Sequence, residues 1–228
     1  MKFGKILRFS IKAIFYLIIL AVNLVVIWRI CFSGDPSEMK TLMVNENTAI
    51  AYENSGDTFV MFTQEQRSLS SNGYFAVTNF TFIPEARQLQ VTVRYNNSTL
   101  RHIEDDYGLD SSLDRKNEIF EFSVVKTTDL TPNDSDDNLN KENLNSERYY
   151  PSKTISAYKT LYSYRKMIFD NIDYEDAVGF FVDMYYIDDI DYETTPSAVV
   201  CIYDSSMENI PVELTKSDKK ALEAYKNK

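Results

Sequence analysis

The chain has 228 residues, with 24 Lys and Arg against 34 Asp and Glu, a formal net charge of −10, and a single His. One His and two Cys are too few for a zinc, haem or iron–sulfur site of ordinary type. The six glycines never form a G-x-G pair, so the sequence carries no phosphate-binding loop of that kind. The acidic balance argues against nucleic acid as a partner, because phosphates require a basic surface. We therefore expect no cofactor, and no enzyme motif is recognised.

The N-terminus has the pattern of a membrane anchor. Residues 1–12 carry four Lys and Arg and no acid, and residues 13–32 are apolar apart from Asn23 and Arg29. A membrane-spanning helix needs roughly 20 apolar residues. Lys12 and Arg29 would extend their charges to the two headgroup regions, and Trp28 is the type of aromatic residue that lies at an interface. The sequence thus predicts a basic cytoplasmic tail over 1–12 and a transmembrane helix over 13–32.

The excess of positive charge before the helix places the N-terminus in the cytoplasm and the rest of the chain outside. The exported part has 19 basic and 34 acidic residues, a charge of −15. Two alternatives stay open. One is a cleaved signal peptide with its cut near residues 31–33, and the other is a lipoprotein attached through Cys31. A retained anchor is favoured, because Arg29 lies too close to either processing site.

Beyond the membrane the hydrophobic pattern alternates with period two, which is typical of half-buried strands. Residues 33–47 are interpreted as a stalk, and residues 48–214 as the extracytoplasmic β domain. In 88–95 the apolar positions predicted to face inward are Leu89, Val91, Val93 and Tyr95, and in 119–124 they are Phe120, Phe122 and Val124. Further strands are predicted at 58–62, 74–82, 178–187, 197–203 and 210–214, whereas 154–169 fits either a strand or a helix face.

Three stretches break the alternation. Residues 98–116 are predicted to form a loop with a short helix, and the polar, acidic stretch 127–151 a long mobile loop. Residues 215–228 are predicted to form a C-terminal helix, with Thr215 and Asp218 as a variant capping box. Strands without a βαβ rhythm predict an antiparallel β-sandwich, and an immunoglobulin-like layout stays open.

The sequence offers few candidate catalytic, metal-binding or ligand-binding residues. His102 lies beside acids and near serines, but nothing in the spacing assembles a nucleophilic triad. The candidate calcium ligands are Asp188, Asp189, Asp191 and Glu193, between two predicted strands; a solvated acidic turn is the alternative. The tyrosine-rich half of the chain offers a candidate binding face that consists of Tyr162, Tyr164, Tyr185 and Tyr186; the alternative, favoured for most of the tyrosines there, is core packing and ordinary strand surface. Cys201 is expected to be a small buried apolar residue, without a disulfide.

These features predict a single-pass protein of the cell membrane that displays an acidic β-sandwich outside the cytoplasm as a binding or scaffolding module. Its expected partners are the lipid bilayer and a protein or envelope polymer. Two rival hypotheses are a membrane-tethered envelope hydrolase, which would use His102 or paired carboxylates, and an accessory subunit of a larger membrane complex. In the second rival, Asn23 would form a hydrogen bond with a partner helix.

Overall fold

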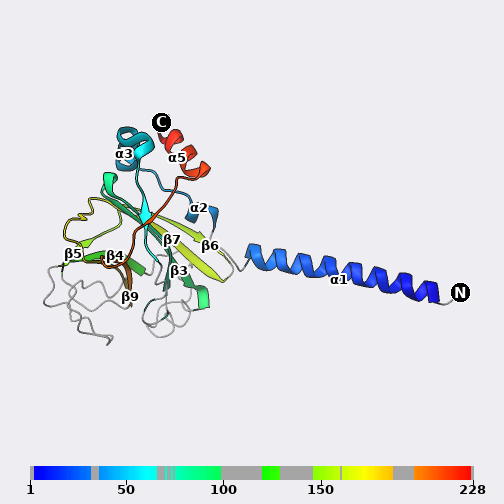
Figure 1. Cartoon of the computed structure of the whole chain (residues 1–228). Helices are drawn as coiled ribbons and strands as arrows, with labels where there is room; N and C mark the ends of the chain where they lie inside the picture. Colours follow the sequence, from blue (N-terminus) through cyan, green and yellow to red (C-terminus); the bar gives the residue numbers. More distant parts are fainter. Residues whose placement is uncertain are drawn as a thin grey trace.

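A computed structural model describes residues 3–31, 36–65, 70, 73, 75–98, 120–128, 146–159, 161–186 and 198–226, and in the first helix the side chains of residues 12–28. That helix, α1 (Phe3–Cys31), projects from the rest of the molecule (Figure 1). The remaining described residues, 36–226, are called the β body below. The calcium candidates Asp188, Asp189, Asp191 and Glu193, as well as His102, lie outside the described residues.

The β body is mainly β and contains two antiparallel sheets, as the period-two pattern predicts. Sheet A has the order β10-β1-β2-β3-β7-β6, and sheet B has the order β5-β4-β8-β9. The strands of sheet A are β10 (Ile210–Pro211), β1 (Phe62–Thr63), β2 (Phe75–Ile83), β3 (Gln88–Asn96), β7 (Tyr162–Phe169) and β6 (Lys153–Tyr158). Those of sheet B are β5 (Ser146–Tyr149), β4 (Phe120–Thr127), β8 (Gly179–Tyr186) and β9 (Ala198–Asp204).

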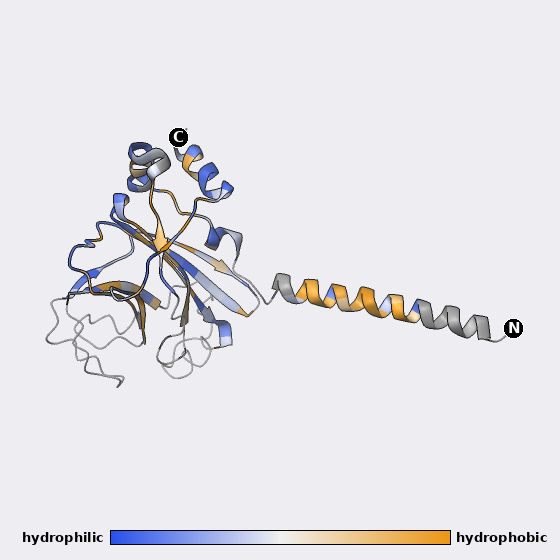
Figure 2. Cartoon of the chain, in the orientation of Figure 1, coloured by the Kyte–Doolittle hydropathy of each residue, from blue (hydrophilic) through white to orange (hydrophobic). Residues whose placement is uncertain are grey.

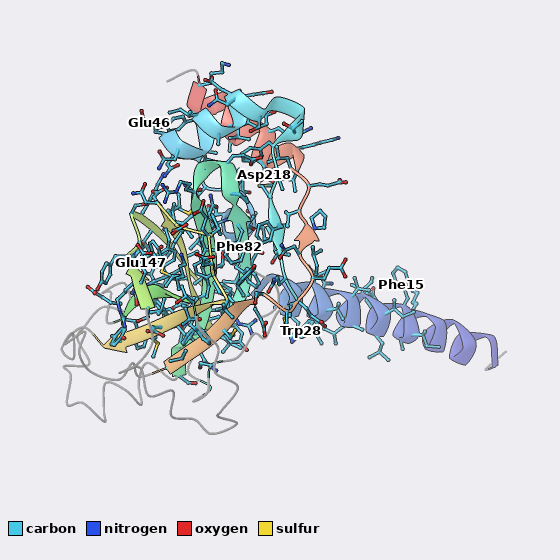
Figure 3. The ribbon with its side chains drawn as sticks, turned by 60° about the vertical axis from the view of Figure 1, so that its left-hand side comes forward. Phe15, Trp28, Glu46, Phe82, Glu147 and Asp218 are labelled. Carbon is cyan, nitrogen blue, oxygen red and sulfur yellow. The ribbon has the colours of Figure 1, made fainter. Side chains whose placement is uncertain are left out.

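One core lies between the two sheets and confirms the inward faces predicted for 88–95 and 119–124. Every apolar residue named for these two faces belongs to it. Phe82 is fully buried within it, and its ring lies 5.0 Å from that of Phe62, 5.6 Å from that of Phe180 and 5.4 Å from that of Tyr203, measured between centroids. Figure 3 shows Phe82 in the interior of the β body.

The ambiguous stretch 154–169 is resolved as strand, because it forms the antiparallel pair β6 and β7. The predicted strands at 58–62 and 210–214 are shorter than expected: η1 (Gly56–Thr58) precedes the two-residue strand β1, and β10 also has two residues. The predicted mobile loop 127–151 contains β5, which pairs with β4, and residues 129–145 are outside the described part.

Helices cover one side of the β body. They are α2 (Ser37–Lys40), α3 (Glu46–Ser55) and α5 (Lys216–Lys226), and the 3-10 turn η2 (Pro84–Ala86) joins β2 to β3. A second apolar cluster lies beneath them, formed by Leu42, Ala51, Met61, Ile83, Ala86 and Leu222. Helix α5 confirms the C-terminal helix that was predicted from the sequence, and it packs beside α3 (Figure 1).

Candidate functional site: the junction between α1 and the β body

The chain that follows α1 lies across the outer face of sheet A. Met39 in this segment, residues 36–45, is 1% exposed. Met43 N donates to Gln90 Oε1 at 3.0 Å, and Gln90 Nε2 donates to Met43 O at 2.6 Å. Thr92 Oγ1 donates to Met39 O at 3.3 Å. A glutamine amide carries both a donor and an acceptor, so it pairs with a backbone in the way a neighbouring strand would.

This arrangement differs from two expectations drawn from the sequence. Residues 36–45, part of the short stalk predicted at 33–47, pack on the sheet. The outer face of β3, which a half-buried strand would turn toward solvent, is covered: Gln88, Gln90 and Thr92 are all nearly inaccessible to solvent. Two features of the sequence could have indicated this packing. The side chains on the outer face of β3 are uncharged, and the predicted stalk contains the apolar residues Met39, Leu42 and Met43.

Lys166 on β7 is buried against the same segment. Its Nζ donates to Thr41 O at 2.6 Å and to Met39 O at 3.3 Å, carbonyls at the end of α2 that lack partners within the helix. Burial lowers the pKa of the Lys166 amine to about 8, and the charge of Asp218 opposes this shift. Through its two hydrogen bonds, the Lys166 amine holds the chain that leaves α1.

Asp218 attaches the same segment to the C-terminal helix. The predicted capping box is present: Asp218 N donates to Thr215 Oγ1 at 3.2 Å, and Thr215 N donates to Asp218 Oδ2 at 2.8 Å. The second carboxylate oxygen, Oδ1, accepts from Leu42 N at 2.6 Å, a contact that local sequence does not predict. Figure 3 shows Asp218 at the start of α5, near α3.

Asp170 binds the C-terminal end of the segment that follows α1, at Asn45 and Asn47. Its carboxylate accepts hydrogen bonds from the side chains of Asn45, Asn47, Gln88 and Ser152. Burial opposes ionisation of this carboxyl, but the hydrogen bonds from these four donors outweigh burial and hold its pKa below the ordinary value. Together with Lys166, this carboxylate holds the chain on the sheet from residue 39 to residue 47.

A separate polar cluster lies on sheet B. Arg148 Nη1 donates to Tyr185 Oη at 2.7 Å and to Ser123 Oγ at 2.8 Å, and its Nη2 lies 3.5 Å from Asp183 Oδ2. The guanidinium also lies 5.2 Å from the centroid of the Tyr185 ring. Burial, and next the charge of Asp183, raise the pKa of Tyr185 to about 12. Arg148 and Tyr185 thus both lie beside Oδ2 of the fully buried Asp183.

The tyrosine face predicted from the sequence is not formed as one exposed surface. Tyr164 and Tyr185 are each 1% exposed, because both lie on covered sheet faces. Tyr162 is partly exposed and lies under the guanidinium of Arg94, at 4.7 Å from the ring centroid. Tyr186 belongs to β8, but its side chain is outside the described part of the chain.

Two further predictions concern metal and thiol chemistry. Among the described residues, no cluster of three or more His, Cys, Asp and Glu side chains is suitably placed for a metal ion. Cys201 was expected to be buried, but it lies on the outer side of β9, is partly exposed, and its Sγ donates to Tyr203 O at 3.4 Å. Its neighbours Val200 and Ile202 are the residues that face the core.

The apolar side chains of α1 are exposed along its described length. Ile14, Phe15, Tyr16 and Trp28 are 57–68% exposed, and Figure 2 shows the middle of the helix as mostly hydrophobic, with short hydrophilic interruptions. Lys12 is exposed, and the side chain of Arg29 is outside the described residues. Over the side chains that the structure describes, which in α1 means residues 12–28, no helix is long and apolar enough to cross a membrane.

Comparison with known proteins gives no relative: the chain matches no family model, no curated protein and no solved structure. The immunoglobulin-like layout accordingly stays a prediction.

Proposed function

We propose that this chain is a single-pass membrane protein in which α1 anchors an acidic β-sandwich outside the cytoplasmic membrane, where the sandwich acts as a binding or scaffolding module. The observation that carries the proposal is the exposure of the apolar side chains of α1. An exposed apolar surface of this extent marks contact with lipid or with another protein. At 1.5 Å per residue, the 29 residues of α1 extend about 43 Å, enough for the hydrocarbon core and both interfaces.

The distribution of charge supports the orientation. Lys2, Lys5, Arg8 and Lys12 precede the apolar stretch, and no acid occurs before Asp35. Positive charges of this kind are retained on the cytoplasmic side. The remaining chain, with its charge of −15, would then be repelled by anionic lipid and would favour cationic partners.

The junction supports a display role. Because Lys166, Gln90 and Asp218 hold residues 39–43, only a short length of chain separates α1 from the folded body. The β body would therefore follow the anchor closely along the chain, while its acidic charge is repelled by anionic lipid. The rival hydrolase hypothesis, which would use His102 or paired carboxylates, stays a prediction, and His102 is outside the described residues.

Two fractionation experiments test the proposal on the full chain with a C-terminal tag. Membranes are washed with alkaline carbonate, and intact cells freed of any outer wall are treated with protease. We expect the full chain to stay in the membrane pellet, and the protease to remove the tagged body from outside. Release by carbonate, or protection of the body until the cells are lysed, would overturn the anchor or its orientation respectively. A body found in the medium would show that the N-terminal segment is a cleaved signal peptide.

A further inference from the structure

Asn23 is the strongly polar residue within the exposed apolar part of α1. It lies about 16 Å along the helix from Lys12 and about 9 Å from Arg29, at a rise of 1.5 Å per residue. Its side chain is exposed, and Nδ2 donates to Ile19 O at 2.8 Å. An asparagine amide has two N–H donors and an oxygen with two lone pairs. This intrahelical bond uses one donor, so the exposed side chain keeps its other donor and Oδ1 for bonds outside the helix.

In a bilayer those groups have no water to bind, and leaving them unsatisfied in hydrocarbon is costly. The amide is complementary to itself, because each copy has both the donor and the acceptor that the other needs. Copies of one chain also insert in the same direction, so Asn23 of each copy lies at the same depth. A different partner would need a matching polar group at that depth, whereas a second copy provides it without any further requirement.

The residues around Asn23 suit a parallel pair of helices. Tyr16 and Asn23 are seven residues apart, at a positions, and Ile19 and Val26, each three residues further on, lie at the d positions of the same face, which is the spacing of a two-stranded coiled coil. All four side chains are exposed. A single Asn at an a position fixes both register and number of strands in such pairs.

We propose that α1 pairs in the membrane with α1 of a second copy of this chain, in parallel, with the two Asn23 amides hydrogen-bonded to each other. The proposal rests on the proposed function, since it requires α1 to lie in the bilayer. The junction would then bring two β bodies side by side at the membrane surface.

The test measures energy transfer between donor-tagged and acceptor-tagged full chains in the same membranes, with carbonate extraction performed on each sample. We expect transfer in the wild type, and Asn23→Leu to lower the association constant about five- to thirtyfold. Asn23→Gln keeps an amide and should retain most of the transfer. Val25→Leu, a change on another side of α1, is the matched control and should leave it unchanged. Protease resistance of the body shows that each variant is folded.

The outcomes separate the two proposals. Carbonate-resistant chains without transfer, or transfer that survives Asn23→Leu, would overturn the paired helices and leave the anchor standing. Release of the wild type by carbonate would overturn the anchor, and the pairing with it. Absence of self-transfer, combined with Asn23-dependent co-purification of another membrane protein, would overturn the second copy as the partner and assign the same amide to a different helix.

Discussion

The apolar residues of α1 and those of the β body occupy opposite environments. Phe15 on α1 is 61% exposed, whereas Phe82 in the body is fully buried among aromatic rings. The two residues are chemically identical, so the difference comes from what surrounds them. Two sheets cover each other in the body, but the described chain places no comparable cover over α1. The apolar side chains of the body are therefore covered by the body itself, whereas those of α1 are exposed in the described chain, as expected for a surface that contacts lipid or another protein.

The largest expected effect comes from making the same substitution in both regions. Phe82→Ala should lower the free energy of unfolding of the body by about 3–5 kcal/mol, because it removes a buried ring and leaves a cavity. Phe15→Ala should change it by less than about 0.5 kcal/mol, the usual range for exposed sites. Denaturant unfolding of the full chain in detergent, followed by circular dichroism in the β-sheet region, measures both. Equal losses would show that α1 contributes to the stability of the body.

A smaller effect concerns the junction, where the two regions meet. The pKa of Lys166 is about 8 in the folded state, against an ordinary 10.5. Between these values the unfolded chain binds more protons, so stability should rise as the pH increases through this interval. From pH 7 to pH 9.5 the gain should reach roughly 2 kcal/mol. Lys166→Met should abolish this rise, whereas the exposed Lys153→Met should keep it. A flat wild-type profile, measured by denaturant unfolding, would contradict the buried amine.

The smallest effect concerns the cap that links the C-terminal helix to the junction. Thr215→Ala removes the hydroxyl that accepts from Asp218 N, and should lower the free energy of unfolding by about 1 kcal/mol. Thr215→Ser keeps a hydroxyl and serves as the control. Hydrogen exchange should rise in α5 and also at Leu42 N, because Asp218 is bonded to both. Faster exchange confined to α5 would show that the cap and the junction are independent.

Much of the fold followed from local patterns. Alternation in 88–95 and 119–124 predicted the strands and their core faces, because strand side chains point to opposite sides with period two. The capping pair at Thr215 and Asp218 was recognisable for a similar reason, since both partners lie within one turn. The ambiguous stretch 154–169 was not decided locally, and its two strands are defined by pairing with each other and with β3.

The candidate site was scarcely predictable. Gln90 and Met43 are 47 residues apart, and Asp218 and Leu42 are 176 apart, so no local pattern joins them. The burial of two residues of the predicted tyrosine face was unpredictable for the same reason: Tyr164 and Tyr185 are each 1% exposed in the folded chain.

Local sequence was enough to predict the strands at 88–95 and 119–124 with their core-facing side chains, the C-terminal helix, and an apolar N-terminal helix flanked by basic residues. These properties depend on neighbours a few positions away. Only the tertiary structure decided that the polar face of β3 is covered, that Lys166 is buried, and that the chain leaving α1 is held on sheet A. Burial of a polar group depends on whether a distant segment supplies its hydrogen bonds, and only the folded chain brings such segments together.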